Sequence, residues 1–142
     1  MRDLKAIHKA CLFASDAHGS QKYGREPYFV HLQAVADMTV RLGGDDVAEQ
    51  VAWLHDVIED TNITSEDLLN AGFSGSVVVA VNYLSKKDGE NYEDYIMCVK
   101  LDKTALLVKK ADTLCNLIQS TKQGNVKRIM KYTKQLQLLS EE

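Results

Sequence analysis

The 142-residue sequence has no Cys-x-x-Cys pair, and its three cysteines, Cys11, Cys98 and Cys115, lie far apart. This arrangement supports neither a zinc knuckle nor a disulfide framework. We therefore expect reduced, buried thiols, as in a protein of the cytoplasm.

The sequence also lacks an apolar run long enough to span a membrane, and residues 1–5 open into a helical pattern instead of a signal peptide. Basic residues are not in excess, because 17 lysines and arginines stand against 20 aspartates and glutamates, for a net charge of −3. A nucleic-acid-binding surface normally carries a positive field. We therefore expect neither a membrane nor a nucleic acid as partner, although a few local lysines could hold a small anionic substrate.

Proline occurs once, and no linker, internal repeat or low-complexity tract interrupts the chain. Apolar residues recur at helical spacing through most of it. We predict an all-α fold in which residues 1–142 form one compact domain, a helical bundle of about seven to eight helices. The predicted helices lie near residues 2–18, 28–42, 46–60, 74–84, 91–101, 103–120 and 126–139, with a further short one after Thr64.

Residues 77–81, Val-Val-Val-Ala-Val, are rich in β-branched side chains, and propensity alone would permit a strand there. No second strand is predicted with which it could pair. Val77, Val81 and Leu84 also keep helical spacing, so we expect a helix.

Residues 54–61, Leu-His-Asp-Val-Ile-Glu-Asp-Thr, gather an unusual set of polar groups on one predicted helix. On a continuous helix, His55 shares a face with Glu59, and Asp56 shares a face with Asp60. A solvated acidic helix end is the simplest interpretation, but acids near a helix C-terminus are disfavoured by the macrodipole. The clustering favours a metal site instead.

Two further residues could complete such a site. His31 follows Pro27, which constrains the loop before it and directs the histidine inward. Asp112 lies on an otherwise apolar helix face, where a lone buried carboxylate would be costly. Its partner is either a metal ion or a lysine such as Lys109 or Lys110.

The other two histidines are not expected to be ligands. We expect His8 to be exposed and His18 to pack at a helix end.

Three motifs in this order resemble a known family. Residues 27–31 read Pro-Tyr-Phe-Val-His and resemble PYxxH, residues 54–61 resemble LHDxxEDT, and residues 108–117 resemble VKxADxxxNL. Together they resemble the HD-domain metal-dependent phosphohydrolases, and more narrowly the hydrolase domain of the RelA/SpoT family and the small alarmone hydrolases. The resemblance covers about residues 14–118 and implies a metal-dependent (p)ppGpp 3′-pyrophosphohydrolase, which releases pyrophosphate and leaves GDP or GTP.

The resemblance also implies roles for individual residues. One Mn²⁺ ion would be held by four side chains, although these ligand types also suit zinc or iron: His31, His55, Asp56 and Asp112. Glu59 and Asp60 would be catalytic, orienting or deprotonating the attacking water. Asn116 and Lys86 would contact the nucleotide, although Lys86 could equally be a solvated turn residue.

The loop between Ala17 and Pro27 is one residue shorter than in the family pattern, and the arginine that stacks on the base there has no clear counterpart. Lys22, Tyr23 and Arg25 are the available substitutes, with Tyr23 able to stack on a base and Arg25 able to bind phosphate. All three could also be ordinary loop residues.

This departure keeps two alternatives open. One is an HD-type phosphohydrolase of another nucleotide, such as a nucleotidase or an NADPH phosphatase. The other is a metal-stabilised domain without catalysis that acts through protein contacts. The six residues of the metal and catalytic set are all present, which favours an enzyme.

Overall fold

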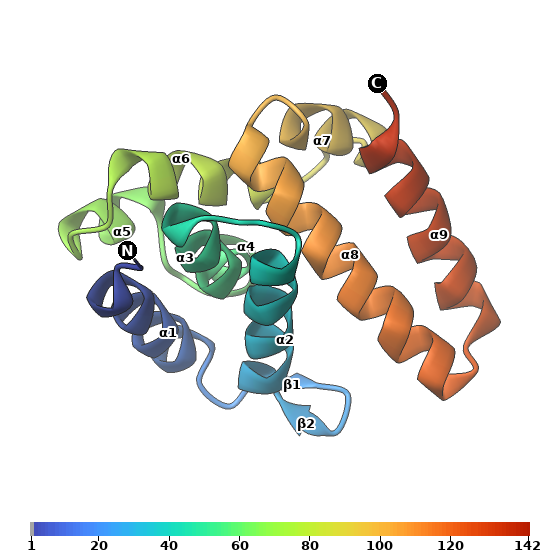
Figure 1. The fold of residues 1–142 in the computed structure, drawn as a ribbon, viewed down its shortest axis with the longest axis horizontal. Helices are drawn as coiled ribbons and strands as arrows, with labels where there is room; N and C mark the ends of the chain where they lie inside the picture. The colour runs from blue at the N-terminus through green and yellow to red at the C-terminus, as the bar shows by residue number, and fades with distance from the viewer. Residues whose placement is uncertain (1) are drawn as a thin grey trace.

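The computed structural model describes residues 2–142, and within them nine helices account for nearly all of the regular structure (Figure 1). The all-α prediction is confirmed. The helices are α1 (Leu4–His18), α2 (Tyr28–Arg41), α3 (Asp46–Leu54), α4 (Val57–Asp60), α5 (Ser65–Asn70), α6 (Gly75–Leu84), α7 (Tyr92–Val99), α8 (Lys103–Gln123) and α9 (Val126–Ser140). None of the helices in residues 2–142 combines the length and apolarity required to cross a membrane.

Side-chain caps explain why most of these helices begin where they do. Thr64 and Asp67 form a reciprocal capping box at the start of α5, as the sequence predicts. In other helices the capping side chain accepts a hydrogen bond from a backbone N–H of the first turn. The capping residues are Asp3, Asp45, Ser74, Asn91, Asp102 and Asn125.

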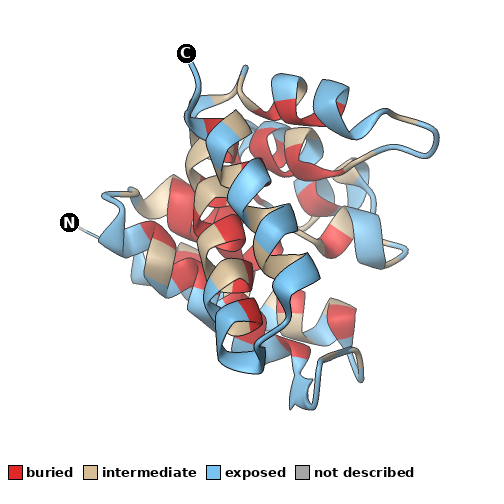
Figure 2. Cartoon of the chain, turned by 90° about the vertical axis from the view of Figure 1, so that its right-hand side faces the viewer, coloured by how far each residue is buried: buried red, intermediate tan, exposed pale blue. Residues whose placement is uncertain are grey.

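The long helix α8 organises the packing. It contacts α2, α3 and α6 on one side and α9 on the other, so that α9 lies at one edge of the molecule (Figure 1). The core between α2, α3 and α8 includes Leu32, Val51, Leu54 and Val108, all fully buried. Helix α9 buries only Gln135 and Leu139, and most of its surface is exposed (Figure 2).

The predicted helix over residues 46–60 is interrupted, which corrects the expectation of one continuous helix. Helix α3 ends at Leu54, and the short helix α4 begins at Val57. The imidazole Nδ1–H of His55 donates to the carbonyl oxygen of Ala52 at 2.7 Å, so this carbonyl bonds a side chain where a continuous helix would use the N–H of Asp56. Because of the break, His55 and Asp56 do not lie on one continuous helix with Glu59 and Asp60, so the predicted i,i+4 pairs do not form in that simple way.

The loop before α2 contains a small antiparallel hairpin that the sequence does not predict. Strand β1 (Lys22–Tyr23) pairs with β2 (Glu26–Pro27), and Tyr23 lies opposite Glu26. Gly24 has a φ of +62°, a left-handed conformation that glycine adopts without steric cost. The hairpin fixes the position of Tyr23 beside α2.

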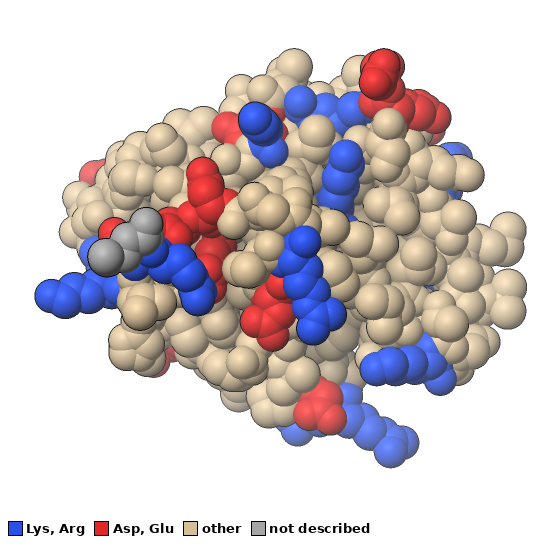
Figure 3. Space-filling model, viewed as in Figure 1, with Lys and Arg blue, Asp and Glu red and all other residues tan. Residues whose placement is uncertain are grey.

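The three cysteines are free, as expected, but they are half-buried and not fully enclosed. Charges of both signs are scattered over the face shown in Figure 3, and no continuous basic field forms there.

Candidate functional site

Three helices bring two histidines and one aspartate together. His31 comes from the first turn of α2, His55 follows α3, and Asp112 lies in the middle of α8. All three are buried, and one potential ligand atom from each lies within 4.8 Å of the others. Nε2 of His31 and Nε2 of His55 lie 3.1 Å and 3.5 Å from Oδ1 of Asp112.

Asp56, the fourth predicted ligand, lies at the edge of this group. Its Oδ2 atom is 3.1 Å from Nε2 of His55, and it also accepts a hydrogen bond from the hydroxyl of Tyr28. Burial and the charge of Asp56 raise the pKa of the Tyr28 phenol, so Tyr28 remains a donor. The four predicted ligands therefore meet in space from three segments of the chain: α2, the turn between α3 and α4, and α8.

The chemistry of His55 fits a metal ion. Because Nδ1 donates to the Ala52 carbonyl, Nε2 is the ring nitrogen that faces the site. Burial opposes the charged ring, but Asp56 and Asp112 raise the pKa of His55 well above its usual value, so a metal ion would displace the proton of Nε2. That atom is buried and has no hydrogen-bond partner among residues 2–142. A histidine oriented through one nitrogen, with a lone pair free on the other, is the usual arrangement of a metal ligand and its supporting contact.

The charges of the two aspartates are stabilised by their surroundings. Burial alone would raise the pKa of Asp56, but His55 and the hydrogen bond from Tyr28 lower it to about 2. Burial acts in the same direction on Asp112, yet Lys109 and the two histidines hold its pKa well below the usual value. Both carboxylates are therefore ionised, the form that binds a cation.

The two oxygens of Asp112 make different contacts. Oδ1 faces the histidines, while Oδ2 lies 3.1 Å from the ammonium group of Lys109. The amide of Asn116, one turn along α8, donates to Oδ1 and to the backbone carbonyl of Asp112, each at 3.1 Å. The sequence left a metal and a lysine as alternative partners for Asp112, and the geometry accommodates both.

The two predicted catalytic acids lie at the rim of the site. Oε1 of Glu59 accepts a hydrogen bond of 2.7 Å from the backbone N–H of Lys86. Partial loss of hydration raises the pKa of Glu59, although this carboxylate still borders solvent. Asp60 accepts a hydrogen bond of 3.1 Å from the side-chain amide of Gln21.

A cavity of about 290 Å³ is lined by three of the four predicted ligands, His31, Asp56 and Asp112, and by the two acids. Its far wall carries residues that sequence reasoning missed. These are Tyr92 from α7 and Arg128, Lys131, Tyr132 and Gln135 from α9. Lys109, which the sequence offered as a partner of Asp112, lines the cavity as well.

The cations of α9 had no distinguishing signal in the sequence, because Lys and Arg on an amphipathic helix usually form a solvated face. The structure places Arg128 and Lys131 against the ring of Tyr132, at 5.6 Å and 5.1 Å from its centroid. The cavity is therefore lined by both carboxylates and cations.

The predicted substrate contacts divide into two groups. Tyr23 lines the cavity, stacks on His31 with ring centroids 4.3 Å apart, and donates a 2.5 Å hydrogen bond to Oδ1 of Asn116. Asn116 also lines the cavity, but both ends of its amide already bond to protein groups.

Three other predicted contacts lie elsewhere. Lys22 and Arg25 are exposed on the hairpin and do not line this cavity. Lys86 acts through its backbone N–H, which holds Glu59, and its side chain is not part of the wall.

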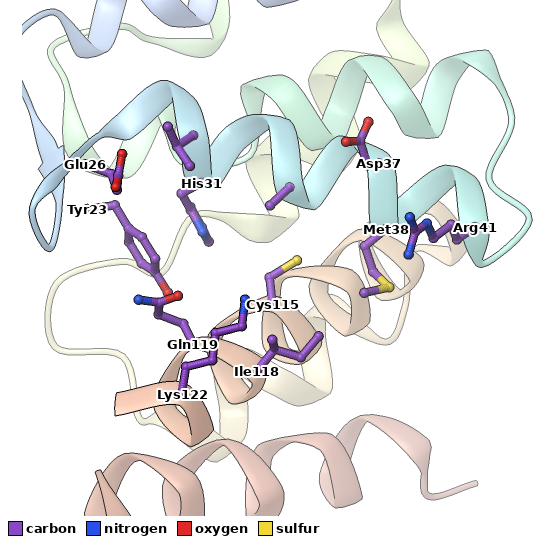
Figure 4. A pocket seen from close by; sticks show the side chains of 12 residues that line it. Tyr23, Glu26, His31, Asp37, Met38, Arg41, Cys115, Ile118, Gln119 and Lys122 are labelled. Atoms are coloured by element: carbon purple, nitrogen blue, oxygen red, sulfur yellow. The ribbon is translucent and has the colours of Figure 1, made fainter. Parts of the chain in front are cut away.

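A second cavity, of about 350 Å³, lies between α2 and α8 (Figure 4). Its floor includes Met38, Cys115 and Ile118, and Arg41 and Lys122 line it as well. Tyr23 and His31 border both cavities, so the two spaces meet at this pair of rings.

Comparison with known proteins identifies relatives of this chain. A family model described as "HD domain" matches residues 10–94. The chain is 34% identical over 126 residues to a guanosine-3′,5′-bis(diphosphate) 3′-pyrophosphohydrolase of Vibrio cholerae, covering 80% of this chain and 18% of the relative. It is 35% identical over 126 residues to the bifunctional (p)ppGpp synthase/hydrolase SpoT of Escherichia coli K12, with the same coverage. The chain thus spans less than a fifth of the length of these relatives.

A solved structure shares the fold. It is described as "A metazoan ortholog of SpoT hydrolyzes ppGpp and plays a role in starvation responses". The match has a TM-score of 0.77 at 21% sequence identity and covers 95% of this chain and 85% of the other.

The ion pair of Asp112 gives a testable expectation. In metal-free protein, Lys109→Met should lower the free energy of unfolding by about 3 kcal/mol, because it leaves a buried carboxylate without its cation. Thermal unfolding in the presence of a chelator measures this loss. Lys110→Met, the neighbouring change on α8, serves as the control. Equal Tm values for the two variants would show that the Lys109–Asp112 contact does not stabilise the site.

Proposed function

The chain belongs to the HD domain family, and from this premise we propose that it is a metal-dependent phosphohydrolase that acts on (p)ppGpp. The proposed reaction breaks the bond between the ribose 3′ oxygen and phosphorus, which releases pyrophosphate and GDP or GTP. One observation carries the proposal. The predicted metal ligands, the acids Glu59 and Asp60 and the cations of α9 all lie together at one cavity. Relatives whose names state the same activity support the choice of substrate.

In this proposal, His31, His55, Asp56 and Asp112 hold one Mn²⁺ ion. The mixed imidazole and carboxylate donors suit Mn²⁺, and the unpartnered Nε2 of His55 supports a cation at this point. When bound, such an ion lowers the pKa of water and stabilises the charge that develops on the phosphoryl group.

In this proposal, Glu59 and Asp60 act as general bases that take the proton of the attacking water. The raised pKa of Glu59 makes it a better base than an ordinary glutamate, and the N–H of Lys86 fixes the direction of its carboxylate. The leaving ribose 3′ oxygen needs a proton, which the same carboxyl groups can return.

Helix α9 contributes positively charged side chains that could bind a diphosphate. Lys109 is already paired with Asp112, so Arg128 and Lys131 are the cations we assign to the phosphate oxygens. The adjoining α2–α8 cavity then takes the base, with Tyr23 at the boundary between the two spaces.

A second candidate rests on the hairpin. Because neither Lys22 nor Arg25 lines the main cavity, this loop provides no cation there to recognise the base. A phosphohydrolase of another nucleotide, such as NADPH, would use the same metal set and the same α9 cations. The substrate assay separates the two candidates.

The first experiment measures turnover of ppGpp, NADPH, GTP and nucleoside monophosphates by the Mn²⁺-loaded protein, with Asp56→Ala as the blank. We expect GDP and pyrophosphate from ppGpp alone. Release of phosphate from NADPH, with ppGpp unchanged, would transfer the assignment to the second candidate.

Metal removal should affect both activity and stability. A chelator should abolish turnover and lower Tm, and Mn²⁺ should restore both, because an ion that binds only the folded state stabilises it. His55→Ala should remove the effect of Mn²⁺ on Tm, whereas His8→Ala, at an exposed histidine, should preserve it. An unchanged response in His55→Ala would show that the site is misassigned.

Glu59→Gln tests the proton transfer. The amide retains the shape of the side chain but cannot accept a proton, so kcat should fall by about 10²- to 10⁴-fold while metal content stays the same. Single-turnover kinetics and metal analysis measure these two quantities. Full activity in this variant would remove Glu59 from the mechanism.

A further inference from the structure

His18 is buried at the end of α1 in a way that simple packing does not explain. Only 6% of the residue is exposed, and its Nε2 atom has no hydrogen-bond partner within residues 2–142. Burying an unpaired ring nitrogen costs free energy that an apolar side chain would avoid. The ring is held instead through its other nitrogen, Nδ1.

Two consecutive contacts connect His18, through Gln21, to Asp60 at the rim of the candidate site. Nδ1 of His18 lies 2.9 Å from Oε1 of Gln21, and Nε2 of Gln21 donates to Oδ2 of Asp60 at 3.1 Å. The Asp60 carboxylate can only accept, so the NH₂ end of Gln21 must face it. The amide oxygen then faces His18, which requires Nδ1 of the histidine to carry the proton.

The backbone also fixes Gln21 at both ends. Its N–H donates to the carbonyl of His18, and its carbonyl accepts from the N–H of Tyr28, both at 3.0 Å. The ring of His18 packs against Tyr28, with centroids 4.6 Å apart. The short helix α4, which ends at Asp60, is only four residues long, and the backbone N–H of Asp60 donates to the carbonyl of Asp56 at 2.9 Å.

We propose that Gln21, oriented by His18, is a positioning residue that holds the carboxylate of Asp60 toward the cavity. The inference rests on the proposed function, since it assigns the network a task in the reaction. A carboxylate on a short, exposed helix end would otherwise rotate freely. One directed donor restricts it to the orientations useful for proton transfer.

The kinetic test is a double-mutant cycle with ppGpp as substrate. Gln21→Leu should lower kcat by about 10- to 100-fold and leave KM nearly unchanged, because it affects orientation and not binding. In an Asp60→Ala background, Gln21→Leu should have no further effect on kcat. The matched control is Gln137→Leu, at an exposed glutamine of α9.

His18 is tested by replacement and rescue. His18→Leu should lower kcat in the same way, whereas His18→Asn, which retains an N–H donor near the position of Nδ1, should restore most of it. A role in packing alone would favour leucine over asparagine. The proposal is overturned if Gln21→Leu leaves kcat unchanged or slows the Asp60→Ala enzyme by the full factor.

A second readout does not depend on the substrate. The side-chain amide resonances of Gln21, assigned by their loss in Gln21→Leu, should shift in Asp60→Ala and in His18→Leu. Unshifted resonances would overturn the positioning network even if the enzyme is active. If the wild type does not hydrolyse ppGpp, the proposed function fails separately, and these spectra still decide whether Gln21 holds Asp60.

Discussion

The site depends on one buried carboxylate, that of Asp112. An ionised group at this depth is stable only when opposite charge and hydrogen bonds surround it. Lys109 and Asn116 supply part of this support from α8, and His31 and His55 face its other side. Each partner is fixed in turn by its own contact, such as the bond from His55 to the Ala52 carbonyl. The packing of α2 and α3 against α8 is thus also what assembles the polar centre.

Two local departures from regular helix serve this centre. At the break after Leu54, His55 bonds to the Ala52 carbonyl and faces Asp112. The hairpin before α2 places the Tyr23 ring on His31 and its hydroxyl on Asn116. Both features give a ligand-type side chain a fixed orientation.

Much of this could be predicted from the sequence. Periodicity and capping residues predicted the helices well, and the motifs around His31, His55 and Asp112 identified three side chains that the fold gathers. The break at His55 was missed because it depends on a side-chain bond that periodicity does not reveal. Arg128 and Lys131 were missed because α9 meets the site only through tertiary packing on α8. For Lys86, a nucleotide contact and a solvated turn residue were the alternatives, and the structure shows its backbone N–H donating to Glu59.

The separation of the two cavities bears on how a nucleotide would be recognised. The cations of the main cavity come from α8 and α9, while the neighbouring space is bordered by the ring of Tyr23 and floored by Met38, Cys115 and Ile118. One face of Tyr23 already packs on His31, so a base can meet only its other face or its edge. Aromatic and apolar contacts discriminate poorly between bases, because every base has a π-face. Under the proposed function, discrimination between bases would therefore depend on the polar side chains that line the same space, such as Asp37, Arg41 and Gln119.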